Sequence, residues 1–219
     1  QSLNLNWKWE DIAKHLKINV RDSMSALDIK NNLLGVCDQM YLFEPGDDTT
    51  VCVLKAVKPK KVKLFTGPPS HKEDDAKVVH ELMNNADIRI VSGGTTSQIV
   101  ARELGVEVKS STEIYDKEVP PIAYIQGVDL VTEGVLTLSK TIDRLKSLSK
   151  SLDSDIFKAK DGASQMAKLL YSASHIKLLV GRSLNIANAE SSFQRDLELR
   201  LHVVGELEKI LVKLGKIVT

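Results

Sequence analysis

The chain has 219 residues, of which 42% are hydrophobic and 27% are charged, a composition typical of globular proteins. Its 30 basic and 29 acidic residues give a formal net charge of +1, which favours neither nucleic acid nor an anionic membrane as a partner. An aromatic content of 5% disfavours a stacking surface for single-stranded nucleic acid. Cys37 and Cys52 lie in apolar stretches without zinc-ligand spacing, which predicts buried, reduced thiols.

The sequence contains no candidate membrane-spanning segment. No stretch approaches the roughly 20 apolar residues that a spanning helix needs, and no signal-peptide pattern precedes Trp7. Together with reduced cysteines, these features favour a cytoplasmic location. Because the sequence opens on Gln1 rather than methionine, we expect it to be a fragment of a longer protein.

Two helices and one strand are predicted before residue 60. Ile12, Leu16 and Val20 recur every four residues, as on one face of a helix, and β-branched residues alternate after the Pro-Gly turn, as in a strand. The predicted elements are helices at 7–20 and 25–41, a turn at 44–48, a strand at 49–57 and a linker at 58–61.

From residue 62 onward, strands and helices alternate through short loops. This rhythm predicts a doubly wound, mostly parallel sheet with helices on both faces, a Rossmann-like α/β domain over 62–219. The long amphipathic helix near the end either lines the core or forms a homodimer interface. Strands are predicted at 62–65, 88–91, 106–108, 175–180 and from 216, an apolar stretch at 122–125, and helices at 72–84, 95–105, 134–149, 161–172 and 195–215.

Three of the predicted strands end in glycine followed by a polar loop. The glycines are Gly67, the pair Gly93-Gly94, and Gly181. Ligands of open α/β sheets bind at the carboxyl ends of the strands, so the glycines are predicted to gather where a site belongs.

The strongest local motif is Ser92-Gly93-Gly94-Thr95-Thr96-Ser97, between a strand and a helix. Glycine allows a ligand to approach the backbone, and the N–H groups at a helix N-terminus suit phosphate or carboxylate. The hydroxyl side chains of the motif add donors. The structural alternative is a tight turn in which Ser or Thr caps the helix.

Charged residues in two further loops are candidate ligand-binding groups. Asp129 and Glu133 flank a predicted helix start, where they could bind a metal ion, bind a ribose or act in acid–base chemistry, or merely cap the helix. Arg182 follows the glycine of a strand end, where it could pair with phosphate or lie on the surface.

The segment PGDDTTVCV, residues 45–53, carries a resemblance to a known family. It resembles the C-terminal motif of PPM-type serine/threonine protein phosphatases, in particular the SpoIIE-like branch, and the two preceding helices fit in order. The resemblance implies that residues 1–57 are the α+β end of a phosphatase domain. It also implies that Asp47, with Asp48 beside it, is a ligand of a dinuclear Mn²⁺ or Mg²⁺ site. SGGTTSQIVARELG (residues 92–105), residues 120–138 and the final helix resemble an extension found on some of these phosphatases.

The sequence departs from that family in its upstream metal ligands. No Asp-Gly-Met-Gly or Ser-Asp-Gly segment precedes Asp47, and a two-metal site needs several carboxylates. We therefore expect the C-terminal portion of a metal-dependent phosphoprotein phosphatase, catalytically incomplete by itself, with an α/β domain that regulates it or senses a ligand. The alternative is a binding module for a phosphate-bearing small molecule such as a nucleotide, without catalysis.

Overall fold

The computed structural model describes residues 7–44, 48–148, 156, 158–183 and 190–219, with the side chains of 190–195 left aside. Contacts divide the chain into two units, Gln1–Lys58 and Pro59–Thr219, which are treated separately below. The division falls inside the predicted linker at 58–61. No helix in the described part of the chain is long and apolar enough to cross a membrane.

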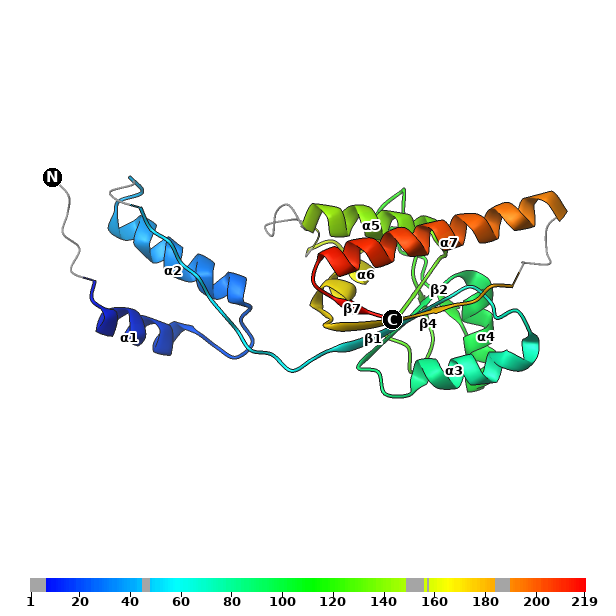
Figure 1. Cartoon of the computed structure of the whole chain (residues 1–219). Helices are drawn as coiled ribbons and strands as arrows, with labels where there is room; N and C mark the ends of the chain where they lie inside the picture. The colour runs from blue at the N-terminus through cyan, green and yellow to red at the C-terminus, as the bar shows by residue number, and fades with distance from the viewer. Residues whose placement is uncertain (1–6, 45–47, 149–155, 157, 184–189) are drawn as a thin grey trace. The chain divides into compact units, whose positions relative to one another are not determined.

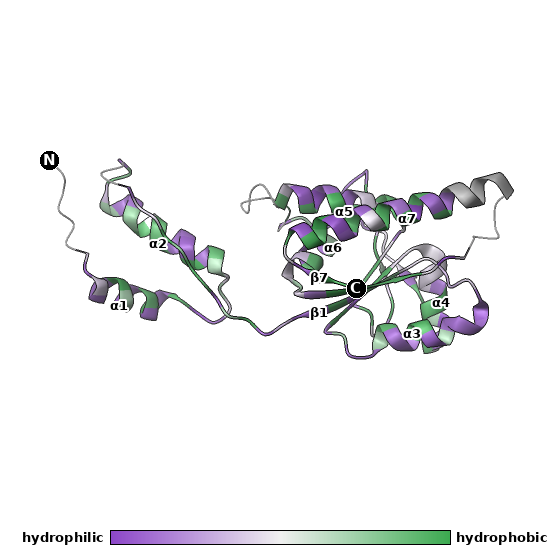
Figure 2. Cartoon of the chain, in the orientation of Figure 1, coloured by the Kyte–Doolittle hydropathy of each residue, from purple (hydrophilic) through white to green (hydrophobic). Residues whose placement is uncertain are grey.

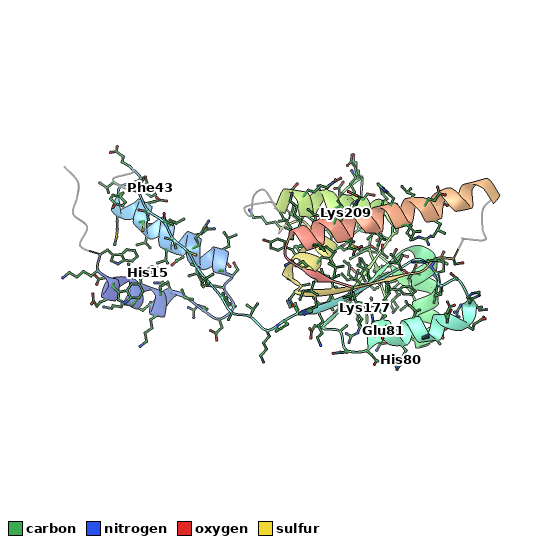
Figure 3. All side chains as sticks on the ribbon, in the orientation of Figure 1. His15, Phe43, His80, Glu81, Lys177 and Lys209 are labelled. Atoms are coloured by element: carbon green, nitrogen blue, oxygen red, sulfur yellow. The ribbon has the colours of Figure 1, made fainter. Side chains whose placement is uncertain are left out.

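The first unit contains two helices, α1 (Trp9–Asn19) and α2 (Ala26–Met40), which confirm the two predicted helices. A capping box starts α2: Asp28 N donates to Ser25 Oγ (3.1 Å), and Ser25 N donates to Asp28 Oδ2 (2.8 Å). A hydrogen bond of 2.7 Å between His15 Nε2 and Asn32 Oδ1 joins the helices, and His15 is labelled in Figure 3. Neither helix has a buried residue, so their formation rests on local interactions.

The predicted strand at 49–57 is wrong. The segment carries no ladder hydrogen bonds, and Leu54 is 94% exposed. Its Lys55 side chain contacts the residues that precede α2, because Nζ donates hydrogen bonds to the carbonyl oxygens of Asp22 (2.6 Å) and Met24 (2.7 Å). A strand needs a paired neighbour, and the described part of this unit offers none. The prediction that both cysteines are buried is also wrong, because Cys52 is exposed and Cys37 is only half-buried.

The second unit is an α/β domain with a mixed seven-stranded sheet. The strand order is β3-β4-β5-β2-β1-β6-β7. Strands β1, β2, β5, β6 and β7 pair in parallel, whereas β3 and β4 run antiparallel at one edge. The strands are β1 (Lys61–Thr66), β2 (Ile88–Ser92), β3 (Lys109–Ser110), β4 (Ala123–Tyr124), β5 (Leu130–Thr132), β6 (His175–Val180) and β7 (Ile217–Val218).

Helices lie on either side of the sheet, as Figure 1 shows, and they pack on it in two separate apolar cores. Leu64 of β1 packs in the core made with α5, α6 and α7, and its neighbour Phe65 packs in the core made with α3 and α4. This alternation is the two-residue period of a strand, and Figure 2 shows each of these helices carrying hydrophobic and hydrophilic residues. The helices are η1 (Lys72–Asp74), α3 (Asp75–Met83), α4 (Gly94–Leu104), α5 (Val135–Leu148), α6 (Gly162–Ser172) and α7 (Glu190–Lys213).

One charged cluster links a helix to the sheet on the α3 side. The carboxylate of Glu81 accepts hydrogen bonds from Lys63 Nζ (2.6 Å) and Lys177 Nζ (2.9 Å), and Figure 3 labels Glu81 and Lys177. These two ammonium groups lower the pKa of Glu81 to about 2, with Lys63 as the larger cause. Lys63 is nearly buried in β1, so the pair lets a charged side chain occupy a core strand.

Two strand predictions in this unit need correction. Residues 106–108 are not a strand, since the pairing begins only at β3 (Lys109–Ser110). Strand β5 lies where the sequence suggested a loop and a helix start, because its three residues stand between Asp129 and Glu133. A three-residue strand between acidic residues shows too little periodicity to be distinguished from a helix cap.

Candidate functional site

The carboxyl ends of the parallel strands open into a cavity of about 450 Å³. Its walls are the loops that follow β1, β2 and β5, together with Pro120 and the part of α7 at residues 196–200. The lining residues are Thr66, Gly67, Pro68, Ser92, Gly93, Gly94, Thr95, Thr96, Pro120, Glu133, Gly134, Val135, Leu136, Asp196, Leu199 and Arg200. Most of the predicted glycine-rich motif therefore faces one cavity.

The loop after β2 is fixed by its own hydroxyl groups. Ser92 Oγ donates to the carbonyl oxygen of Glu133 (2.8 Å), and Ser97 Oγ donates to that of Gly93 (2.8 Å). Thr96 Oγ1 accepts a hydrogen bond from the backbone N–H of Gly67 (2.9 Å), which joins this loop to the one after β1. These buried hydroxyls hold the loops together, whereas the sequence suggested that they would contact a ligand.

The backbone at the start of α4 supplies the donors instead. Ser97 N donates to the carbonyl oxygen of Gly93 (2.9 Å), so the N–H groups of Gly94, Thr95 and Thr96 precede the first helical hydrogen bond. Gly93 has a φ of 115° and provides no side-chain cap. Gly94 and Thr95 are exposed at the cavity, and a Cβ on Gly94 would meet no atom within 4 Å. This end of α4 is therefore open to an anion.

Glycines let the neighbouring loops approach closely around the cavity. A Cβ on Gly181, at the end of β6, would lie 2.1 Å from the carbonyl oxygen of Pro68 and 2.2 Å from that of Gly67. Gly181 N also donates to the carbonyl oxygen of Thr66 (2.9 Å). The loops after β1 and β6 thus touch backbone to backbone, which only glycine at position 181 allows.

Arg200 is a cationic wall residue that the sequence did not single out. It lies on α7, half-buried, and its Nη1 makes a long hydrogen bond of 3.4 Å to the carbonyl oxygen of Gly181. Among the described residues, no carboxylate forms an ion pair with it. Burial lowers the pKa of Arg200, opposed in part by the charge of Asp196, and the guanidinium remains charged near neutral pH. A desolvated cation that has few partners among the described residues favours an incoming anion.

The predicted site residue Asp129 lies outside the cavity. It precedes β5, at the amino end of the strand, where its Oδ2 accepts a hydrogen bond from Arg89 N (2.7 Å). Glu133 follows the same strand and lines the cavity with an exposed side chain. Both acids were expected to flank the start of a helix, and only Glu133 does so. Asp129 lies at the other end of β5, because the whole strand separates the two residues.

Two further predicted residues, Arg182 and Ser97, are absent from the lining. Arg182 is exposed beyond the end of β6. Ser97 is buried behind the loop, with its hydroxyl bonded to Gly93. Arg200, on α7, supplies the positive charge that Arg182 was expected to supply.

The predicted metal ligands belong to the first unit. Asp47 lies outside the described residues, and Asp48 is exposed. No group of three or more His, Cys, Asp or Glu side chains in the described part of the chain could hold a metal ion. The Mn²⁺ or Mg²⁺ site at Asp47 and Asp48 therefore stays a prediction.

Compared with models of known protein families, with curated proteins and with solved structures, the chain matches none. The phosphatase resemblance thus has no support beyond the residues that suggested it. The described lining of the cavity supplies backbone donors, one guanidinium and two carboxylates. Such an arrangement can hold and orient an anionic ligand.

Proposed function

We propose that the second unit is a binding module for a phosphate-bearing small molecule. The phosphate would accept hydrogen bonds from the N–H groups of Gly94, Thr95 and Thr96 and pair with the guanidinium of Arg200. The observation that carries the proposal is the uncapped N-terminus of α4 opening into the same cavity as this half-buried arginine.

The strand order supports this choice of site. Strands β5-β2-β1-β6-β7 follow the order of a doubly wound nucleotide-binding sheet, and we propose that classification for the unit. In such sheets the chain reverses its direction of addition at one point, here between β1 and β6, and ligands bind beside it. The loops that touch through Gly67 and Gly181 follow these two strands.

A saturation experiment on the full chain tests the proposal. We expect AMP and inorganic phosphate at low ionic strength to raise the apparent melting temperature, because a ligand that binds only the folded state stabilises it. Gly94→Val should abolish the shift, since valine would occupy space beside the first N–H groups without meeting other atoms. Gly205→Val is the matched control, a change at another open glycine outside the cavity. An unchanged shift in Gly94→Val, or no shift with any phosphate compound, would contradict the proposal.

The PGDDTTVCV motif favours a second, wider role. In this role the chain is the C-terminal part of a SpoIIE-type protein phosphatase that uses Mn²⁺ or Mg²⁺ and acts on a phosphoprotein, and the second unit senses a ligand for it. The upstream sequence of the gene tests this directly. An upstream region without Ser-Asp-Gly and Asp-Gly-Met-Gly segments would contradict the phosphatase role and would not bear on the proposed binding module.

A further inference from the structure

The ionisable side chains of the cavity limit how much negative charge a bound ligand can carry. The described lining contains one cation, Arg200, and two carboxylates, Glu133 and Asp196. The start of α4 adds the equivalent of about half a positive charge. This positive charge nearly balances that of one phosphate monoester, whereas a polyphosphate would bring further negative charges into a described lining that already holds two carboxylates.

Two large apolar side chains line the same cavity while remaining open to solvent. Leu136, near the start of α5, is 48% exposed, and Leu199, on α7, is 51% exposed. Single exposed leucines are ordinary on a protein surface. These two leucines lie on helices that share one apolar core, and both line a cavity that also contains anion donors. Apolar side chains combined with a few polar groups are typical of a small-molecule site.

We infer that the ligand is a monophosphate with a flat apolar body, of the nucleoside monophosphate class, rather than a nucleoside polyphosphate. This inference rests on the proposed function and specifies its ligand. The phosphate lies against the N–H groups of Gly94 to Thr96, and the body covers Leu136 and Leu199. The cavity of about 450 Å³ lies within the range of ordinary small-molecule sites, roughly 300–1,000 Å³.

Isothermal titration of the full chain with four compounds tests the inference. The compounds are inorganic phosphate, ribose 5-phosphate, AMP, and ATP in the presence of EDTA. We expect AMP to bind about tenfold more tightly than ribose 5-phosphate, because only AMP brings a base to the leucines. We expect ATP without a divalent cation to bind about tenfold more weakly than AMP, because its extra charges meet Glu133 and Asp196.

Variants separate the two parts of the inference. Leu199→Ser should weaken AMP binding severalfold and leave ribose 5-phosphate unchanged, whereas Val212→Ser, an exposed α7 position outside the cavity, should change neither. The double change Glu133→Gln with Asp196→Asn should strengthen ATP binding more than AMP binding, because it removes only the repulsion.

The outcomes distinguish this inference from the proposed function. Equal binding of AMP and ribose 5-phosphate, or tightest binding by ATP without divalent cations, would overturn the inference while the phosphate-binding module stands. No binding by any of the four compounds would overturn both. Loss of ribose 5-phosphate binding in Leu199→Ser would also overturn the inference, because the leucine would then support the phosphate end.

Discussion

The two units differ in what holds their secondary structure. In the first unit α1 and α2 form from periodic sequences and, for α2, a capping box, yet neither buries a residue. In the second unit two apolar cores cover the sheet, and side chains such as Leu207 and Phe65 are fully buried. Local signals therefore suffice to form helices, whereas a ligand cavity needs a packed scaffold that fixes several loops at once.

Separating the two units should show the largest difference between them in thermal unfolding. We expect residues 59–219 alone to unfold in one cooperative transition near the melting temperature of the full chain. Residues 1–58 alone should unfold gradually, because helices of 11 and 15 residues without buried side chains are marginal in water. Circular dichroism melts of both pieces measure this. A sharp transition in 1–58 would contradict the comparison.

Paired glycine substitutions sharpen the same contrast. Gly181→Ala should destabilise the protein by about 4 kcal/mol, because its Cβ would clash with the backbone of Gly67 and Pro68. Gly35→Ala in α2 has open space and should stabilise that helix by about 1 kcal/mol. Urea unfolding of both variants gives the two values. A mild effect of Gly181→Ala would mean that the loops around the cavity yield easily.

Leucine truncation compares burial in the two units. Leu207→Ala should cost about 3 kcal/mol of unfolding free energy, because it leaves a cavity in the core under α7. Leu54→Ala should cost almost nothing, because that side chain is 94% exposed. Equal losses in urea denaturation would show that residues 49–57 are packed more firmly than their exposure indicates.

Glu81 gives a smaller, pH-dependent effect confined to the second unit. Its pKa is lowered to about 2 by Lys63 and Lys177, so its contribution to stability is present above about pH 4.5, the ordinary value. That contribution is lost as pH falls toward 2. We expect Glu81→Gln to reduce stability at pH 7 and to approach the wild type at pH 2–3, as measured by urea midpoints. Glu208→Gln, at an exposed α7 position, is the control, and a pH-independent loss in Glu81→Gln would contradict the ion-pair account.

The sequence predicted elements well where the signals are local. Gly105, in the left-handed conformation, caps the C-terminus of α4, and Asp161 caps the N-terminus of α6, where its Oδ1 accepts a hydrogen bond from Ser164 N (2.9 Å). Strands depend on partners elsewhere in the chain. The valine-rich segment at 49–57 therefore looked like a strand but has no partner, and β5 was missed because only its neighbours reveal it.

The candidate site shows the same difference between features that a local pattern predicts and features that depend on distant parts of the chain. Residues 92–96 were predicted from glycines and hydroxyls in one short loop, and they line the cavity. Asp129 was misplaced because β5 was missed. Arg200 and Leu199 were overlooked because they reach the cavity only through the way α7 packs over the strand ends, which no local pattern encodes.

Amide chemical shifts of the full chain, titrated with AMP, test whether the start of α4 and Arg200 bind a phosphate. We expect saturable shifts of the Gly93 to Ser97 amides and of the Arg200 Nε–H, with the amides of α1 and α2 unchanged. We also expect these shifts to be lost in Gly94→Val. Saturable shifts confined to residues outside the cavity, or no shifts at millimolar AMP, would contradict it.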